Sequence, residues 1–311
     1  MTLPTVPFMR FRKHAAVISI VLMLASIVSL AVNGLNYGLD FTGGVQIELL
    51  YSDSPDLDGI RDTLTDSGYP NHEVVFFGTD NDVLIRLQDQ GAAGEDQAAQ
   101  TAEAVVEILR SATDASLELK RREFVGSQVG DELREQGGLG MLVALGMIMM
   151  YIALRFQFKF AVGAVASLAH DVVLTLAFFS VTGLSFDLTV LAAVLAVIGY
   201  SLNDTIVVAD RIRENFRILR GKEPDQVIDI AVTQTLIRTM ITSLTTLLVL
   251  FSLYFFGGQV VEGFSIALIF GVVVGTYSSI YIASSTLMFM NITKEDLMPP
   301  VRDKEELDAL P

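Results

Sequence analysis

The sequence contains no cysteine and no tryptophan among its 311 residues. Without cysteine the chain can form neither a disulfide framework nor a cysteine-ligated metal site. Basic residues are also scarce, with 21 Lys and Arg against 36 Asp and Glu, which gives a net charge of -15. A chain so acidic is not expected to bind nucleic acid.

Several motifs that carry chemistry are missing as well. The chain has no GxxxxGK[ST] phosphate-binding loop, no HExxH zinc motif and no GxSxG nucleophile elbow. The histidine of the acidic segment, His72, has no cysteine or histidine neighbour with which it could share a metal. We therefore expect no enzyme activity, no cofactor and no metal site.

Apolar residues are what the sequence has in abundance. They make up 51% of the chain, and the mean hydropathy of +0.51 is too high for a soluble protein of this length. Six apolar runs reach the roughly 17 to 25 residues that span a bilayer, so we expect an α-helical polytopic membrane protein with six transmembrane helices. The runs are approximately Ala15–Val32, Gly138–Leu154, Phe160–Leu184, Leu188–Ala209, Leu236–Phe256 and Val260–Met290.

The first apolar run follows basic residues and ends near the small-residue triplet "SLA", so it could be a cleaved signal peptide. Its apolar core is longer than the roughly 7 to 15 residues of a typical signal sequence. We interpret it as an uncleaved anchor.

Basic residues in the short connections predict the orientation, because Lys and Arg remain cytoplasmic. They occur before the first run, between the second and third, and after the fourth, whereas the turns at 185–187 and 257–259 have none. Both chain ends are therefore expected in the cytoplasm. This divides the chain into a cytoplasmic N-terminus (1–14), a first helix (15–33), a periplasmic domain (34–136), five further helices with a cytoplasmic loop at 210–235 (137–290), and a cytoplasmic tail (291–311).

The outer segment, residues 34–136, holds 21 acidic and 7 basic residues and so a charge of -14. Its patterns alternate between strand and helix in the order βαββαβ, with Asp56 as a helix cap and "TDND" as a hairpin turn. This order predicts a small α+β ferredoxin-like domain. Gln88–Gln97 is the expected flexible loop, and the domain is interpreted as a binding or moving part.

Polar residues interrupt three of the apolar runs. In the fourth run Asn203 and Asp204 lie near the cytoplasmic end, with Ser201 on the same helix face as Asp204. In the third, Asp171 lies at four-residue spacing from Ser167 and Thr175, with His170 beside it. In the fifth, Arg238 belongs to a polar stripe that includes Thr239, Thr242 and Thr245. Arg238 and Asp204 lie at similar depths and could therefore meet.

An isolated charge at the bilayer centre costs at least ~2.5–3.5 kcal/mol, so these residues imply pairing or access to water. One interpretation is a structural ion pair between helices, with Ser and Thr as hydrogen-bonding partners. The other is a proton relay through Asp204, Arg238 and Asp171, because burial and a nearby arginine shift the pKa of an aspartate in opposite directions. Asp171 could instead only fasten its helix, and His170 is expected to be a packed or surface residue rather than a proton carrier.

The last apolar run carries Gly271, Gly275 and Ser279 at four-residue spacing. Small residues so spaced allow two helices to approach closely. The partner is either another helix of this chain or a second chain.

Four motifs in this order resemble the SecF members of the SecD/SecF family of bacterial protein-export membrane proteins, in the resistance-nodulation-division superfamily. The resemblance covers nearly the whole chain and departs from the family pattern at Ala209, where phenylalanine is usual. The motifs are "YGLDFTGGVQIEL" (Tyr37–Leu49), "HDVV" (His170–Val173), "GYSLNDTIVVADRIREN" (Gly199–Asn215) and "RTMITSLTTLL" (Arg238–Leu248).

The resemblance implies a multi-pass protein of the bacterial inner membrane, surrounded by lipid, that works with SecD, the SecYEG channel and YajC. Such a protein uses the proton motive force to help a translocating polypeptide across or off the outer side. Asp204 would be the main protonatable residue, Arg238 its partner, and Gly43 and Gly44 a structural turn after the first span. Two alternatives are a non-transporting membrane scaffold and a proton-driven exporter of small molecules from the same superfamily.

Overall fold

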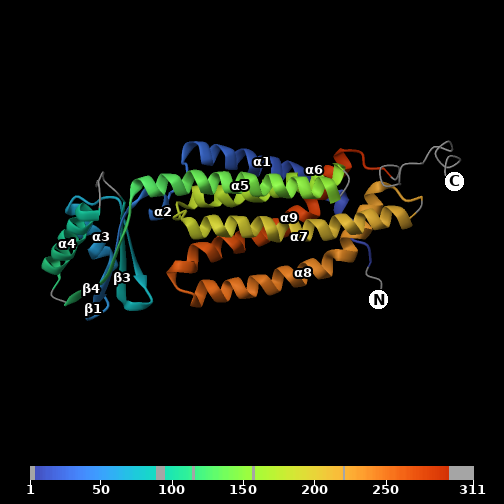
Figure 1. The fold of residues 1–311 in the computed structure, drawn as a ribbon. Coiled ribbons are helices and arrows are strands. Elements are labelled where there is room, and N and C mark those ends of the chain that lie inside the picture. The colour runs from blue at the N-terminus through green and yellow to red at the C-terminus, as the bar shows by residue number, and fades with distance from the viewer. Residues whose placement is uncertain (1–3, 89–94, 114–115, 156–157, 220, 294–311) are drawn as a thin grey trace, which may run out of the picture.

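A computed structural model describes residues 4–88, 95–113, 116–155, 158–219 and 221–293. A small sheet domain stands at one end of a long helical bundle (Figure 1). Helix α1 begins and helix α9 ends at the opposite end of the bundle. Most of the predicted loop Gln88–Gln97 and of the tail 291–311 lies outside the described residues.

Six helices are long and apolar enough to cross a membrane, which confirms the predicted number. Their bounds are α1 Arg12–Val32, α5 Ser127–Arg155, α6 Phe158–Thr182, α7 Leu188–Ile218, α8 Pro224–Phe256 and α9 Glu262–Phe289. Two short 3₁₀ segments, η1 Phe8–Phe11 and η2 Gln259–Val261, precede α1 and α9.

Helices α7 and α8 are longer than their apolar runs and take up most of the segment 210–235. Helix α7 continues to Ile218, and α8 already begins at Pro224, where proline suits the first helical position. The segment is thus largely helical, with a short connection between the two helices.

The sheet domain has the ferredoxin-like topology that the pattern predicts. Its four strands pair antiparallel in the order β2-β3-β1-β4, and the chain visits them in the order βαββαβ. The elements are β1 Gly44–Tyr51, α3 Leu57–Asp66, β2 His72–Phe77, β3 Thr79–Gln88, α4 Glu95–Ala112 and β4 Leu117–Val125.

Helices α3 and α4 cover one face of this sheet and leave the other face toward the bundle (Figure 1). The covered face is apolar: Ile47, Leu49 and Ile85 are fully buried against Ala102 and Val105 of α4. The Asp56 carboxylate caps α3 by accepting from the Asp58 backbone N–H, as expected. The hairpin turn is shorter than expected, because Gly78 (φ 87°) makes it and Thr79–Asp82 already belong to β3.

The sheet domain is joined to the bundle through a short helix, α2 Leu39–Thr42, that packs on α5. Gly43 and Gly44 follow with φ of 74° and 140°, a backbone that other residues rarely adopt. Before α2, Tyr37 forms a parallel bridge with Phe186 of the α6–α7 turn, and the Asp40 carboxylate accepts from Leu188 N at 3.1 Å. The sheet domain is therefore fastened to the N-terminal ends of α5 and α7.

Helix α1 belongs to the bundle. Its Ser19 and Ser29 hydroxyls bond Tyr277 of α9 and Ser180 of α6 at 3.0 and 2.9 Å. The uncleaved anchor stays a prediction, which these contacts favour.

Helix α9 packs against α6, α7, α8 and α1. Its small residues face α7 of the same chain. A Cβ atom added at Gly271 would lie 2.1 Å from Val197 Cγ2, and one at Gly275 would lie 3.2 Å from Ser201 Cβ. The predicted small-residue face therefore packs within the chain, and its glycines set how closely α7 and α9 approach.

We expect Gly271→Ala to lower the stability of the bundle by about 1–3 kcal/mol, the usual range for overpacking, because the new methyl group overlaps Val197. The measurement is thermal unfolding of the full chain in detergent. Gly199→Ala is the matched control on α7, since a Cβ there meets nothing within 4 Å. Equal melting temperatures for the two variants would contradict the proposed contact.

The uncovered sheet face carries an ion pair between Lys120 Nζ and Asp82 Oδ1 at 2.5 Å. The hydrogen bonds from Lys120 and from the Thr79 hydroxyl hold the pKa of Asp82 below its ordinary value of 3.8, and the same pair raises the pKa of Lys120 above 10.5. The stability from Asp82 is thus present above pH 3.8 and lost as pH falls through the lowered pKa. The stability from Lys120 is present below pH 10.5 and lost as pH rises through the raised pKa.

Asp82→Asn should therefore weaken hydrogen-exchange protection of β3 and β4 in the full chain at pH 7. The difference from the unsubstituted chain should vanish below the folded-state pKa of Asp82, once exchange rates are corrected for their intrinsic pH dependence. The exposed neighbour Asp80 supplies the control Asp80→Asn. A loss of protection that is the same at every pH would show that the charge of Asp82 is not the cause.

Candidate functional site

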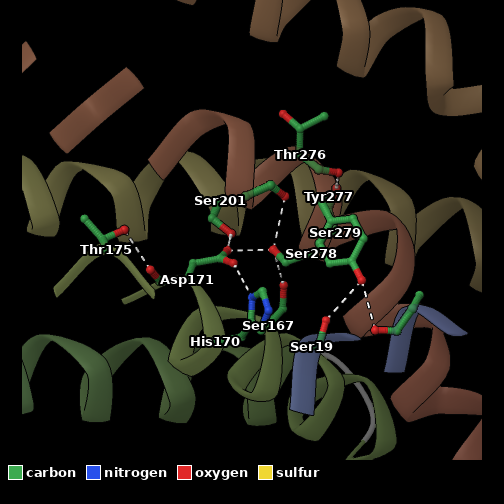
Figure 2. Close-up of polar contacts among 12 residues, drawn as sticks. Ser19, Ser167, His170, Asp171, Thr175, Ser201, Thr276, Tyr277, Ser278 and Ser279 are labelled. Carbon is green, nitrogen blue, oxygen red and sulfur yellow. Dashed lines mark hydrogen bonds and ion pairs between the residues drawn. The ribbon is translucent and has the colours of Figure 1, made fainter. Parts of the chain in front are cut away.

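Asp171 of α6 is fully buried in the bundle, and its carboxylate is surrounded by donors (Figure 2). Oδ1 lies 3.0 Å from His170 Nδ1. Oδ2 accepts from the Ser201 hydroxyl of α7 at 2.5 Å and from the Ser278 hydroxyl of α9 at 2.6 Å. One buried carboxylate thus joins three helices.

The donors around Asp171 are themselves held in place. The Ser278 hydroxyl oxygen accepts from the Ser167 hydroxyl at 2.9 Å, and the Thr175 hydroxyl donates to the Asp171 backbone carbonyl at 2.7 Å (Figure 2). The absence of a side chain at Gly275 lets Ser201 approach, because a Cβ there would lie 3.2 Å from Ser201 Cβ. A buried carboxylate needs such satisfaction to stay folded.

Asp204 of α7 is only half-buried and joins two other helices. Its Oδ1 accepts from the Thr239 hydroxyl of α8 at 2.6 Å, and its Oδ2 accepts from the Ser279 hydroxyl of α9 at 2.5 Å. Asp204 therefore ties α7 to α8 and α9 while part of its surface stays accessible.

The two aspartates are connected through neighbouring positions on the same helices. Ser278 and Ser279 are consecutive on α9, and one donates to Asp171 while the other donates to Asp204. On α7, Ser201 bonds Asp171 from a position one turn before Asp204. A shift of α7 or α9 that changes one carboxylate's contacts would therefore disturb those of the other.

Arg238 does not form the expected ion pair with Asp204 in the described part of the chain. Its side chain is exposed, and its neighbour Thr239 takes the position facing the carboxylate. Successive residues on an α-helix point about 100° apart, so both cannot face Asp204. Arg238 instead lines a pocket of about 520 Å³ with Asp210 and Glu214.

The other predicted polar residues differ in their contacts. Ser201 bonds Asp171 rather than Asp204. Asn203 is exposed, and the hydroxyls of Thr242 and Thr245 donate to backbone carbonyls of their own helix. Of this supporting set, Ser201 is the one in contact with an aspartate.

The donors from α9 were missed from the sequence. Ser278 and Ser279 lie in the middle of α9, and the four-residue spacing identifies Ser279 as a small packing residue. The signal available was a pair of consecutive hydroxyls far along the helix from its acid, Glu262. Among the described residues, no group of three His, Asp or Glu side chains could hold a metal ion.

A cleft separates the uncovered sheet face from the bundle. Two adjoining pockets of about 490 and 240 Å³ share Glu73, Arg86, Leu184 and Ser185 in their walls. Arg86 pairs with Glu73 at 3.1 Å, while Glu262 at the start of α9 also lines the smaller pocket. The cleft therefore has strand residues on one wall and helix ends on the other.

A bundle of six candidate spans with two neighbouring buried carboxylates and a ferredoxin-like domain at one end defines a polytopic membrane protein. Residues 105–293 match the family described as protein export membrane protein SecD/SecF, C-terminal, and residues 28–54 match the SecD/SecF GG motif. The chain belongs to the SecD/SecF family, and its curated relatives are SecF subunits.

Two such relatives are the protein translocase subunits SecF of Vibrio alginolyticus and Pseudomonas aeruginosa. They are 47% and 48% identical to this chain, over 99% of it and over 97% and 98% of their own lengths. The name of a translocase subunit describes a non-enzymatic role.

Solved structures agree with this assignment. The crystal structure of SecDF from Thermus thermophilus, described as a translocon-associated membrane protein, superposes with a TM-score of 0.80 at 34% identity. The match covers 94% of this chain and 39% of that chain. This chain thus corresponds to a part of the longer protein.

The environments of the two aspartates predict different costs of removing them. Asp171→Ala leaves the buried donors of His170 and Ser201 without their acceptor, so we expect a loss of at least about 2 kcal/mol and a clearly lower melting temperature in detergent. Asp204→Ala should cost less, because that carboxylate is half-exposed and Ser279 keeps the Thr276 carbonyl as an acceptor. The prediction fails if Asp204→Ala is the more destabilising variant.

Proposed function

We propose that the chain is the SecF subunit of a bacterial Sec protein-export machine and that it uses the proton motive force on Asp204. The observation that carries this proposal is a half-buried intramembrane carboxylate that ties together α7, α8 and α9. Intramembrane acids of this kind mark proton relays in pumps and transporters.

Protonation of Asp204 would change the contacts between these helices. As a carboxylate it accepts from Thr239 and Ser279 at once. As a neutral acid one of its oxygens carries a proton and becomes a donor, so the hydroxyl opposite must turn away or be released. The tie between α8 and α9 then weakens, and the helices gain freedom to move.

Arg238 is the proposed partner in this cycle. It lies one residue from Thr239 and lines the pocket that holds Asp210 and Glu214. A rotation of α8 that carries Thr239 away from Asp204 would bring Arg238 toward the charged carboxylate. Neutralising Asp204 would release it again.

Asp171 is the second member of the relay. It contacts the residues next to the Asp204 site on both α7 and α9, so its protonation and that of Asp204 are coupled through Ser201, Ser278 and Ser279. The gradient supplies enough free energy, since one charge crossing the membrane potential gains about 2.3 kcal/mol per 100 mV.

SecD is the proposed partner for the exposed face of the bundle. Arg238 and Asn203 are exposed at membrane depth, where lipid would leave their polar groups unsatisfied. Thr242 and Thr245 are exposed as well, but their hydroxyls bond their own helix. A second membrane subunit would cover them. The longer SecDF chain, of which this chain matches 39%, supports such a companion.

The remaining surroundings follow from this role. The bundle lies in the bacterial inner membrane with both chain ends in the cytoplasm, and the domain 34–136 lies in the periplasm. There it acts on the translocating polypeptide beside the SecYEG channel and YajC, with the cleft under the sheet as the surface available for contact. Asp40 and the Tyr37–Phe186 bridge transmit movements of α6 and α7 to the domain.

The scaffold alternative assigns these acids a purely structural role and predicts no response to the gradient. The small-molecule exporter alternative would have twelve spans in one chain, and this chain has six candidate spans among its described residues. The proton-driven role of Asp204 is therefore the interpretation to test first.

The test is Asp204→Asn in vesicles that keep the partner subunits, with export of a secreted precursor followed with and without a proton gradient. We expect the complex to assemble, as judged by co-purification, and the gradient-dependent part of export to fall at least tenfold. Asp225→Asn, at a half-buried carboxylate in the first turn of α8, is the control. Unchanged gradient-dependent export in Asp204→Asn would sink the proposal.

A further inference from the structure

His170 is buried on α6, with 4% of its surface exposed, yet it uses only one ring nitrogen. Nδ1 lies 3.0 Å from Asp171 Oδ1. Nε2 is buried and has no hydrogen-bond partner among the described residues, and the same is true of the Ser285 hydroxyl of α9. A buried polar atom without a partner is rare and usually marks a bound molecule or a functional group.

Both groups line one groove between α1, α6 and α9, with a volume of about 470 Å³. The groove lies in the half of the bundle that holds the start of α1 and the end of α9, away from the sheet domain (Figure 1). Its walls are mostly apolar, and His170 is the one titratable side chain among the described lining residues. These are Ala16, Ser19, Ile20, Met23, Leu24, Ala166, His170, Ile282, Ser285, Thr286 and Phe289.

The groove offers what an ordered water needs. A buried water requires space for one probe and roughly 2–4 polar partners. Nε2 of His170 and the Ser285 hydroxyl lack partners, and Thr286 and Ser19 also line the groove. Both atoms are buried just beneath the groove wall, so a water that enters between them would give each a partner.

We propose that His170 is a proton-transfer residue that connects water in this groove with Asp171. This inference rests on the proposed function, because it names a route by which protons reach or leave the same pair of aspartates. In the inward direction Nε2 takes a proton from a hydronium ion in the groove, while the proton on Nδ1 passes to Asp171 Oδ1. The ring stays neutral overall, one proton has moved, and the reverse sequence returns it to water.

The contacts of His170 continue to the neighbourhood of Asp204. Asp171 Oδ2 accepts from Ser278, and the next residue, Ser279, donates to Asp204 Oδ2, although no hydrogen bond joins the two serines among the described residues. The pocket at Arg238 lies against α8, whereas the groove at His170 lies against α1. The acids are thus approached from two separate openings, both in the half of the bundle away from the sheet domain.

Two ionisable side chains face His170. Asp171 faces it from its own helix, and Tyr277 faces it from α9 with the rings 6.2 Å apart. The Tyr277 hydroxyl donates to the Ala15 carbonyl and also bonds Ser19 of α1, so it is engaged elsewhere (Figure 2). The groove residues of α1 bring no charge.

A purely structural histidine would serve as a donor to Asp171 and nothing more. The substitution His170→Asn separates these roles, because an asparagine amide nitrogen can take the place of Nδ1 while nothing replaces Nε2. His14→Asn, at an exposed position of α1, is the matched control.

The assay uses the full complex in vesicles and follows gradient-dependent export against pH. We expect His170→Asn to assemble, to lose at least fivefold of gradient-dependent export, and to change the pH profile of that export. In His170→Gly, added imidazole should enter the groove and restore export, with a dependence on the pKa of the imidazole used.

The outcomes separate this inference from the proposed function. If Asp204→Asn abolishes gradient-dependent export while His170→Asn keeps both its rate and its pH profile, the His170 route is overturned. The proposed function of Asp204 is then still supported. Rescue of His170→Gly that ignores the pKa of the added base would also overturn it, since that result indicates cavity filling. If neither variant changes the response, both proposals fail.

Discussion

The need of two intramembrane carboxylates for hydrogen-bond donors organises the helical bundle. Asp171 and Asp204 can remain at membrane depth only because each accepts hydrogen bonds from two hydroxyls of neighbouring helices. Those hydroxyls reach the acids only if α7 and α9 lie close together. Gly271 and Gly275 provide that approach, so the packing of small residues and the polar network depend on each other.

This dependence explains why α9 is central although it carries no charge in its middle. Its consecutive serines bond one aspartate each, and its glycine face holds α7 at a fixed distance. Helices α1, α5 and α8 are far more exposed along their spans than α6. The network around the two aspartates therefore lies in the best-packed part of the bundle. Pockets beside α1 and α8 lie next to it.

The sequence predicted the fold well and the site only in part. Apolar run length and strand alternation are local signals, so they predicted six spans and the βαββαβ order. The depth of Asp204 and Arg238 could be counted from helix ends. Their direction around each helix could not, because one residue of rotation separates Arg238 from Thr239. The free Nε2 of His170 depends on three helices meeting, which no local pattern reports.

The passage from β4 to α5 has a mechanical consequence. Only Gly126 separates the last residue of the strand, Val125, from the first of the helix, and α5 then continues for 29 residues through the membrane. At 1.5 Å per residue this is a rod of about 43 Å. A tilt of about 5° at its inner end would displace the outer end by about 4 Å, a length comparable with one residue of an extended chain. Because one residue joins strand and helix, any tilt of α5 would move the edge strand β4 with it.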